Sequence, residues 1–277
     1  MRFRIRPHAD IWIETETDIV GAQVRIPGSY APLGPESGPL MGTIFWMIVS
    51  DACRLLAQAG KSFTVAGDEP ELPQNTVWKT SDRPLMGEYF DTVMRGLELI
   101  GSELGEIGNI SSMAVDTLLK GGTVYFYSRY PQSFASEATG RRGGFAFARA
   151  LSDGKPPGTD RDCVIMGTYA PDDPADIANL SKFRAAGMRA ASVGPVTRGG
   201  KIPTGDTVFR NTEAQAGLMI DTFGLFAVPG FTRKVCPVSG VLATSILWSV
   251  CADIANTIIE RTGNTPGIYF NGAIAWD

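Results

Sequence analysis

The residues best suited to bind a small anion follow a short β-branched and aromatic run, residues 123–127, which is predicted to be a buried strand. A helix is predicted to begin at about Phe134, and four polar residues lie between the two elements: Ser128, Arg129, Gln132 and Ser133. A helix start presents unpaired backbone N–H groups and the positive end of the helix dipole. At the carboxyl edge of a parallel sheet, this combination favours a negatively charged ligand. An ordinary strand–loop–helix unit without a ligand fits the same stretch equally well.

The overall composition excludes several classes of protein. The 277 residues carry a net charge of −4 without a basic stripe, which argues against a nucleic-acid partner or an anionic membrane. The four cysteines are far apart and form no Cys/His cluster, so we expect free thiols in a reducing compartment and no metal site. The N-terminus lacks the apolar core of a signal peptide, and we expect a cytoplasmic protein.

Two common site motifs are missing. No Gly-x-Gly-x-x-Gly follows a strand, so no dinucleotide cofactor is expected. No Gly-x-Ser-x-Gly elbow is present and His8 is the single histidine, which argues against a hydrolase triad. His8 is better explained as a surface or turn residue than as an acid–base catalyst.

The elements around the polar loop alternate between strand and helix. Strands are predicted at 123–127, 163–167 and 188–193, with helices from Phe134 and over 176–186. This order predicts an α/β fold with a doubly wound parallel sheet. Further predictions are helices at 88–104 and 107–119, and short strands at 62–66, 207–210, 218–222 and 267–270.

Two long apolar helices are predicted to be copies of each other. Residues 33–51 align without a gap to residues 235–253, and the aligned pairs include Ser37/Ser239 and Trp46/Trp248. We therefore expect a partial repeat over 1–75, a linker over 76–87 and a complete domain over 88–277. A half-domain leaves an apolar helix and strand edges to be covered, so we expect a homodimer or a higher homo-oligomer.

From about Glu88 onward the chain resembles the SIS (sugar isomerase) domain, in particular the bacterial SIS proteins grouped with phosphoheptose isomerases. Residues 121–145 resemble the family's glycine-bounded strand, ligand loop and helix, with Glu137 and Arg141 on matching positions. Residues 162–195 resemble the second strand–loop–helix–strand unit, and residues 234–250 resemble the start of a later helix. The resemblance covers about two thirds of the chain.

This resemblance implies a three-layer α/β sandwich around a five-stranded parallel sheet, dimerisation, and binding of a sugar phosphate. Catalytic members of the family move a proton between neighbouring sugar carbons, which makes Glu137 the candidate base. Pairing with Arg141 or with the helix dipole is the alternative role for Glu137. Ser128, Ser133, Thr168 and Ser239 would supply hydroxyl groups to the phosphate, although Ser239 also fits a helix cap.

The sequence departs from the family pattern in both ligand loops. The family's Gly-x-Gly-His-Ser loop is replaced by residues 128–132, which include a proline without an N–H group. The second loop keeps one hydroxyl, Thr168, and is followed by Asp172 and Asp173, which would repel a phosphate. A non-catalytic SIS-like module for assembly or ligand sensing is therefore the second hypothesis, and turnover is left open.

Overall fold

The architecture comes from a computed structural model, which describes residues 22–25, 33–35, 37–61, 84–130, 133–140, 145, 147–151, 158–222, 224–228, 231 and 233–266. Its centre is a sheet of five parallel strands in the order β4-β3-β5-β6-β7. The strands are β3 (Val124–Tyr127), β4 (Ala148–Ala150), β5 (Cys163–Gly167), β6 (Arg189–Pro195) and β7 (Ala214–Leu218). The predicted α/β fold with a five-stranded parallel sheet is confirmed. If these five strands are numbered 1 to 5 along the chain, from β3 to β7, their order across the sheet is 2-1-3-4-5, the order of flavodoxin-like sheets.

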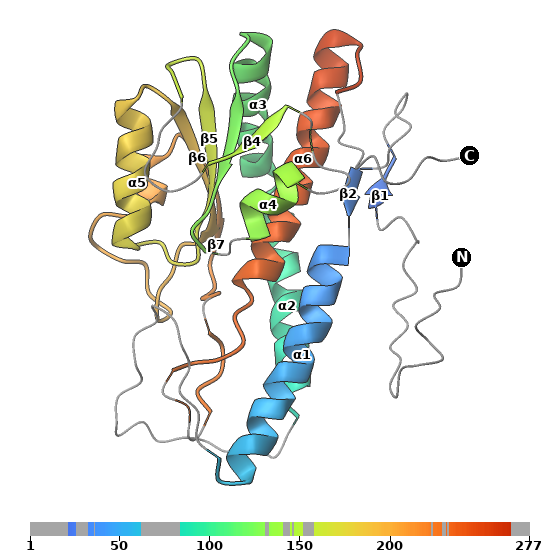
Figure 1. The fold of residues 1–277 in the computed structure, drawn as a ribbon, viewed down its shortest axis with the longest axis vertical. Helices are drawn as coiled ribbons and strands as arrows, with labels where there is room; N and C mark the ends of the chain where they lie inside the picture. Colours follow the sequence, from blue (N-terminus) through green and yellow to red (C-terminus); the bar gives the residue numbers. More distant parts are fainter. Residues whose placement is uncertain are drawn as a thin grey trace.

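Helices cover both faces of this sheet and create three layers (Figure 1). One face is covered by α3 (Leu104–Leu119), α4 (Ser133–Gly140) and α6 (Ser239–Thr262), and the other by α5 (Pro174–Ala185). Residues that alternate along β3, β5 and β6 enter separate cores on the two faces. All five residues of β5 are buried, as expected for a central parallel strand.

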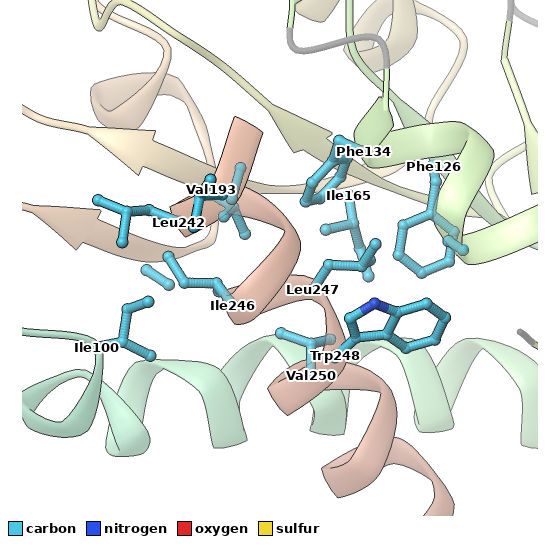
Figure 2. Packing of buried hydrophobic residues seen from close by; sticks show 14 of the residues in the cluster. Ile100, Phe126, Phe134, Ile165, Val193, Leu242, Ile246, Leu247, Trp248 and Val250 are labelled. Carbon is cyan, nitrogen blue, oxygen red and sulfur yellow. The ribbon is translucent and has the colours of Figure 1, made fainter. Parts of the chain in front are cut away.

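The larger core lies between the sheet and α6. Leu247 projects from α6 towards Phe126 of β3, Phe134 of α4 and Ile165 of β5 (Figure 2). Each of these side chains is fully buried. This packing fixes α4 and α6 over the strands whose carboxyl ends carry the predicted site.

Two further helices form an antiparallel pair at one end of the molecule (Figure 1). α1 spans Ser37–Gln58 and α2 spans Leu85–Ser102. The Asp51 carboxylate accepts a hydrogen bond from the Leu85 backbone N–H at 3.1 Å and forms an ion pair with Arg54 at 2.7 Å. This carboxylate therefore ties the middle of α1 to the start of α2.

The helices predicted as copies both exist, and they begin at the aligned residues Ser37 and Ser239. A short antiparallel pair, β1 (Ala22–Val24) and β2 (Leu33–Pro35), precedes α1. The repeat itself and the domain boundaries stay predictions. Residues 85–87, which were assigned to the linker, lie within α2.

Two strand predictions after β6 were wrong. Residues 207–210 contain no strand, and a 3₁₀ turn, η2 (Phe209–Asn211), begins there, with the adjacent residues Val208 and Phe209 both buried rather than alternating as in a half-buried strand. The last strand of the sheet is β7 at 214–218 rather than 218–222. β4 was not predicted, and the strands predicted at 62–66 and 267–270 lie outside the described residues.

By length and composition alone, α1 and α6 could each cross a membrane. In the most apolar stretch of α6, 56% of the residues are buried, whereas in that of α1 only 17% are buried. α6 is therefore a core helix, whereas few residues of α1 are fully buried.

Candidate functional site

The candidate site lies where the loops after β3 and β5 leave the sheet. β3 and β5 are parallel neighbours, with Tyr127 opposite Met166. The chain continues from β3 to α4 on one face and from β5 to α5 on the other. This divergence is the switch point at which open α/β sheets hold ligands. Ser128, Arg129 and Thr168 all follow these two strands.

α4 reaches the same place because Gly167 has no side chain. A Cβ atom on Gly167 would lie 2.6 Å from the ring of Phe134, the second residue of α4. Glycine at the end of β5 therefore lets the start of α4 pack against it. The amino end of α4 and the carboxyl ends of β3 and β5 are thus close together.

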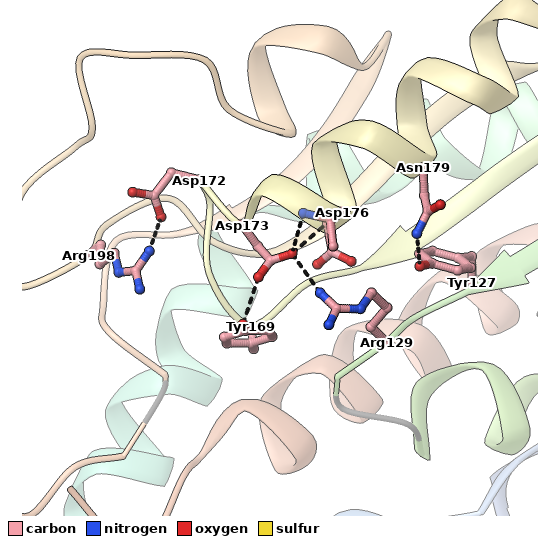
Figure 3. A network of polar contacts seen from close by, with 9 residues as sticks. Tyr127, Arg129, Tyr169, Asp172, Asp173, Asp176, Asn179 and Arg198 are labelled. Carbon is pink, nitrogen blue, oxygen red and sulfur yellow. Dashed lines mark hydrogen bonds and ion pairs between the residues drawn. The ribbon is translucent and has the colours of Figure 1, made fainter. Parts of the chain in front are cut away.

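Asp173 is the centre of the polar contacts at this switch point (Figure 3). Its Oδ1 accepts from Arg129 Nη1 at 2.9 Å and from the backbone N–H groups of Ala175 and Asp176 at 3.0 and 2.8 Å. Its Oδ2 accepts from the Tyr169 hydroxyl at 2.7 Å. Asp173 is thus both the N-cap of α5 and the ion-pair partner of Arg129.

The environment keeps Arg129 charged and Tyr169 neutral. Burial acts to lower the pKa of Arg129, but the nearby carboxylates of Asp173 and Asp176 outweigh it and the pKa is raised. Burial and the hydrogen bond to Asp173 both raise the pKa of Tyr169. The Tyr169 hydroxyl consequently remains a hydrogen-bond donor at neutral pH.

The two acids that were expected to repel a phosphate both have basic partners. Asp172 pairs with Arg198 at 2.8 Å on the exposed side of the loop, and Asp173 pairs with Arg129 (Figure 3). Behind them, Asn179 Nδ2 donates to the Tyr127 hydroxyl at 2.6 Å, which joins α5 to β3. The loop is therefore held by charge pairs on two sides.

Two aromatic rings pack against each other beside Arg129. The Tyr130 and Tyr169 rings meet edge to face with 5.6 Å between centroids, and the Arg129 guanidinium lies 5.7 Å from the Tyr130 ring centroid. Tyr130 is exposed, whereas Tyr169 is buried. A ligand at the switch point would have to displace Tyr130 or enter beside it.

Thr168 lies deeper than the sequence suggested. Its side chain is fully buried and its hydroxyl has no hydrogen-bond partner. A Cβ atom on Gly194 of β6 would lie 2.8 Å from this hydroxyl and 2.4 Å from the Thr168 carbonyl oxygen. An unpaired buried hydroxyl is costly in a native structure, and a ligand could reach this one only if the loop after β5 moved.

Ser239 reaches the site through Thr222. The Thr222 carbonyl accepts from the Ser239 backbone N–H at 2.9 Å, and the Thr222 hydroxyl approaches the Tyr169 carbonyl at 3.5 Å. Ser239 is the first residue of α6 and Val238 is its N-cap, without a side-chain capping bond. The Ser239 N–H is already used, so only its hydroxyl remains to contact a ligand.

The other predicted site residues are placed as follows. Ser133 opens α4, but its side chain lies outside the described residues, as does Gln132. Glu137 lies in the second turn of α4, and it is half-buried. Arg141 and His8 lie outside the described residues.

Two cavities lie further along the same edge of the sheet. One of about 440 Å³ is lined by Glu103, Arg210 and Gly217, among others. The other, of about 480 Å³, lies between α2, with Arg95, and the stretch after β7, with Asp221 and Lys234. Neither of these two cavities is lined by a predicted site residue.

Sequence reasoning missed the contacts that organise this site. Asp173 was read as a repelling charge, although an aspartate followed by Pro174 is a strong helix-start signal and could have identified its capping role. The hydrogen bond between Tyr169 and Asp173 and the burial of Thr168 under Gly194 left no signal in the sequence.

Neither a protein-family model nor a curated protein matches this chain.

Proposed function

We propose that the chain binds a small phosphorylated sugar at the switch point between β3 and β5. The observation that carries this proposal is the arrangement of donors around Asp173. Three of the four hydrogen bonds that it accepts, from Tyr169, Ala175 and Asp176, do not involve Arg129. Asp173 would therefore stay satisfied if the guanidinium turned away.

Arg129 is suited to exchange one anion for another. Its side chain is 21% exposed, and its planar guanidinium binds carboxylate and phosphate with similar geometry. A phosphate dianion carries more charge than a carboxylate and offers three acceptor oxygens. An incoming phosphate would take the guanidinium from Asp173, while the hydroxyls of Ser128 and Thr168 and the start of α4 supply further donors.

Proton transfer on the bound sugar is a further part of this proposal. Glu137 is the carboxylate on α4, the helix whose start points at the switch point, and it would serve as the base of an aldose–ketose isomerisation. Glu137→Gln would then abolish turnover and keep ligand binding. The proposed location is the cytoplasm, with no metal or organic cofactor.

A non-catalytic module is the second candidate, and the Tyr130–Tyr169 contact favours it. These rings pack against each other next to Arg129, and Arg129 is already neutralised by an acid. A protein that only senses a ligand, or that assembles with a partner, tolerates such a closed site.

A thermal-shift titration with hexose and heptose phosphates distinguishes the two candidates. If the chain binds sugar phosphates, they should stabilise the wild type, and Arg129→Gln should lose this stabilisation. Arg198→Gln is the matched control: it breaks the more exposed ion pair with Asp172 and should keep the stabilisation. Arg95→Gln tests whether the anion binds in the 480 Å³ cavity instead. If no sugar phosphate stabilises the wild type, the module becomes the better explanation.

A further inference from the structure

The outer surface of the α1–α2 pair is apolar to an unusual degree. Nine large side chains on it expose between 37% and 56% of their area: Met41, Phe45, Ile48, Leu55, Leu56, Met86, Phe90, Met94 and Leu97. We call these nine residues the hairpin face. At full areas of about 150–250 Å² each, they leave on the order of 700 Å² uncovered. Monomers rarely expose a patch this large, and a standard interface buries about 800 Å² per partner.

The spacing along α1 is that of a packing seam. Met41, Phe45 and Ile48 follow one another at intervals of four and three residues, and Leu55 comes seven residues later. This is the pattern of a helix that packs against other helices in a bundle.

The aligned helix α6 shows what such a seam does when it is covered. In the alignment of residues 33–51 with 235–253, Met41, Phe45 and Ile48 correspond to Ala243, Leu247 and Val250 of α6. These three α6 residues are at most 3% exposed. The equivalent face of α1 is therefore of the kind that this chain buries.

From these observations we propose that the hairpin face binds the hairpin face of a second copy, with α1 of each copy packed against α2 of the other in a four-helix bundle. The charges of the two helices favour this pairing over α2 against α2. α1 carries one acid and one base, Asp51 and Arg54, which pair with each other, whereas α2 carries Glu88, Asp91 and Glu98 against a single Arg95. Two-fold symmetry would set the neutral α1 of each copy beside the acidic α2 of its partner and keep the two acidic helices apart.

The same charges argue against a lipid surface as the occupant. Membrane-surface helices place Lys and Arg beside their apolar face. α2 instead exposes Glu88, Asp91 and Glu98, which anionic lipid headgroups would repel. The proposed interface is independent of the sugar-phosphate site.

Sedimentation velocity of the full chain between 1 and 100 µM tests the interface. The wild type is expected to be a dimer. Phe45→Glu and Phe90→Glu would each weaken the dimer on the order of a hundredfold or more, because they bury an unpaired charge. Leu119→Glu, which charges a 52% exposed leucine at the end of α3, is the matched control and should leave the dimer intact.

Mixing two variants tests the pairing of helices and excludes simple misfolding. Phe45→Lys and Phe90→Glu are each expected to be folded monomers with wild-type circular dichroism, and an equimolar mixture should form a heterodimer. A monomeric wild type at 100 µM, or wild type that co-sediments with phosphatidylcholine–phosphatidylglycerol vesicles, would overturn the proposal. Dimeric single variants, or folded monomers that fail to associate when mixed, would overturn it as well.

Discussion

Arg129 and Asp173, which follow adjacent parallel strands, are joined by an ion pair of 2.9 Å at the edge of the sheet. The pair joins the loop after β3 to the N-cap of α5 at the switch point of the sheet. The contact stabilises these two loops and, under the proposed function, holds the cation that an anionic ligand would need.

Asp173→Ala should lower the free energy of unfolding by about 2–4 kcal/mol. It removes the α5 cap, worth about 1 kcal/mol, and leaves the mostly buried Arg129 without its carboxylate. Asp172→Ala, next to it, breaks only the more exposed pair with Arg198 and should change stability by less than about 0.5 kcal/mol. Urea unfolding of both variants checks this, and equal losses would contradict a central role for Asp173.

Thr168→Val should leave stability unchanged or raise it slightly. Valine has the same shape and removes a buried hydroxyl that has no partner. If the hydroxyl contacts the ligand, the variant should also lose the sugar-phosphate thermal shift. A variant that is destabilised by more than about 1 kcal/mol would mean that the hydroxyl has a structural partner.

Gly194→Ala should cost about 3 kcal/mol or more. Its φ is +148°, and a Cβ atom would lie 2.4 Å from the Thr168 carbonyl oxygen, so β5 and β6 would have to separate. Gly199 also has a positive φ, +61°, but a Cβ atom there would have no other atom within 4 Å. Gly199→Ala should therefore lower the free energy of unfolding by only about 1 kcal/mol. Thermal unfolding of the two variants measures the difference, which isolates the close approach at Thr168.

Stability should fall at alkaline pH through Cys163. Burial raises the pKa of this thiol to about 11 from an ordinary 9.0, while a hydrogen bond with Thr117 opposes the shift. A raised folded-state pKa gives stability that is complete below pH 9 and is lost as the pH rises through about 11. Between pH 9 and pH 11 the free energy of unfolding of the wild type should therefore fall by roughly 2–3 kcal/mol more than that of Cys163→Ala. If the free energies of unfolding of the two proteins depend on pH in the same way, the thiol does not titrate as expected.

The central fold could be predicted from sequence because its signals are local. Residues 163–167 are wholly apolar and β-branched in part, which is typical of a central parallel strand, and the helix predicted over 176–186 corresponds to α5 (Pro174–Ala185). The long helices α1 and α6 followed from apolar periodicity. The 3₁₀ turn at Phe209 could not be predicted in the same way, because two adjacent buried residues fit a strand equally well.

The placement of the candidate residues at one edge of the sheet could be predicted from sequence, but their contacts could not. Ser128, Arg129 and Thr168 follow β3 and β5, as expected, since parallel strands end together. The burial of Thr168 depends on Gly194, 26 residues later, and the partner of Arg129 is 44 residues away. Such pairings are set by packing between elements and leave no local pattern.

A structure determined with a bound hexose or heptose phosphate would test the proposed binding site. We expect the phosphate between Ser128, Arg129, Thr168 and the start of α4, with the guanidinium turned from Asp173 onto the ligand. A phosphate bound elsewhere, with the Arg129–Asp173 pair intact and Tyr130 still against Tyr169, would contradict it.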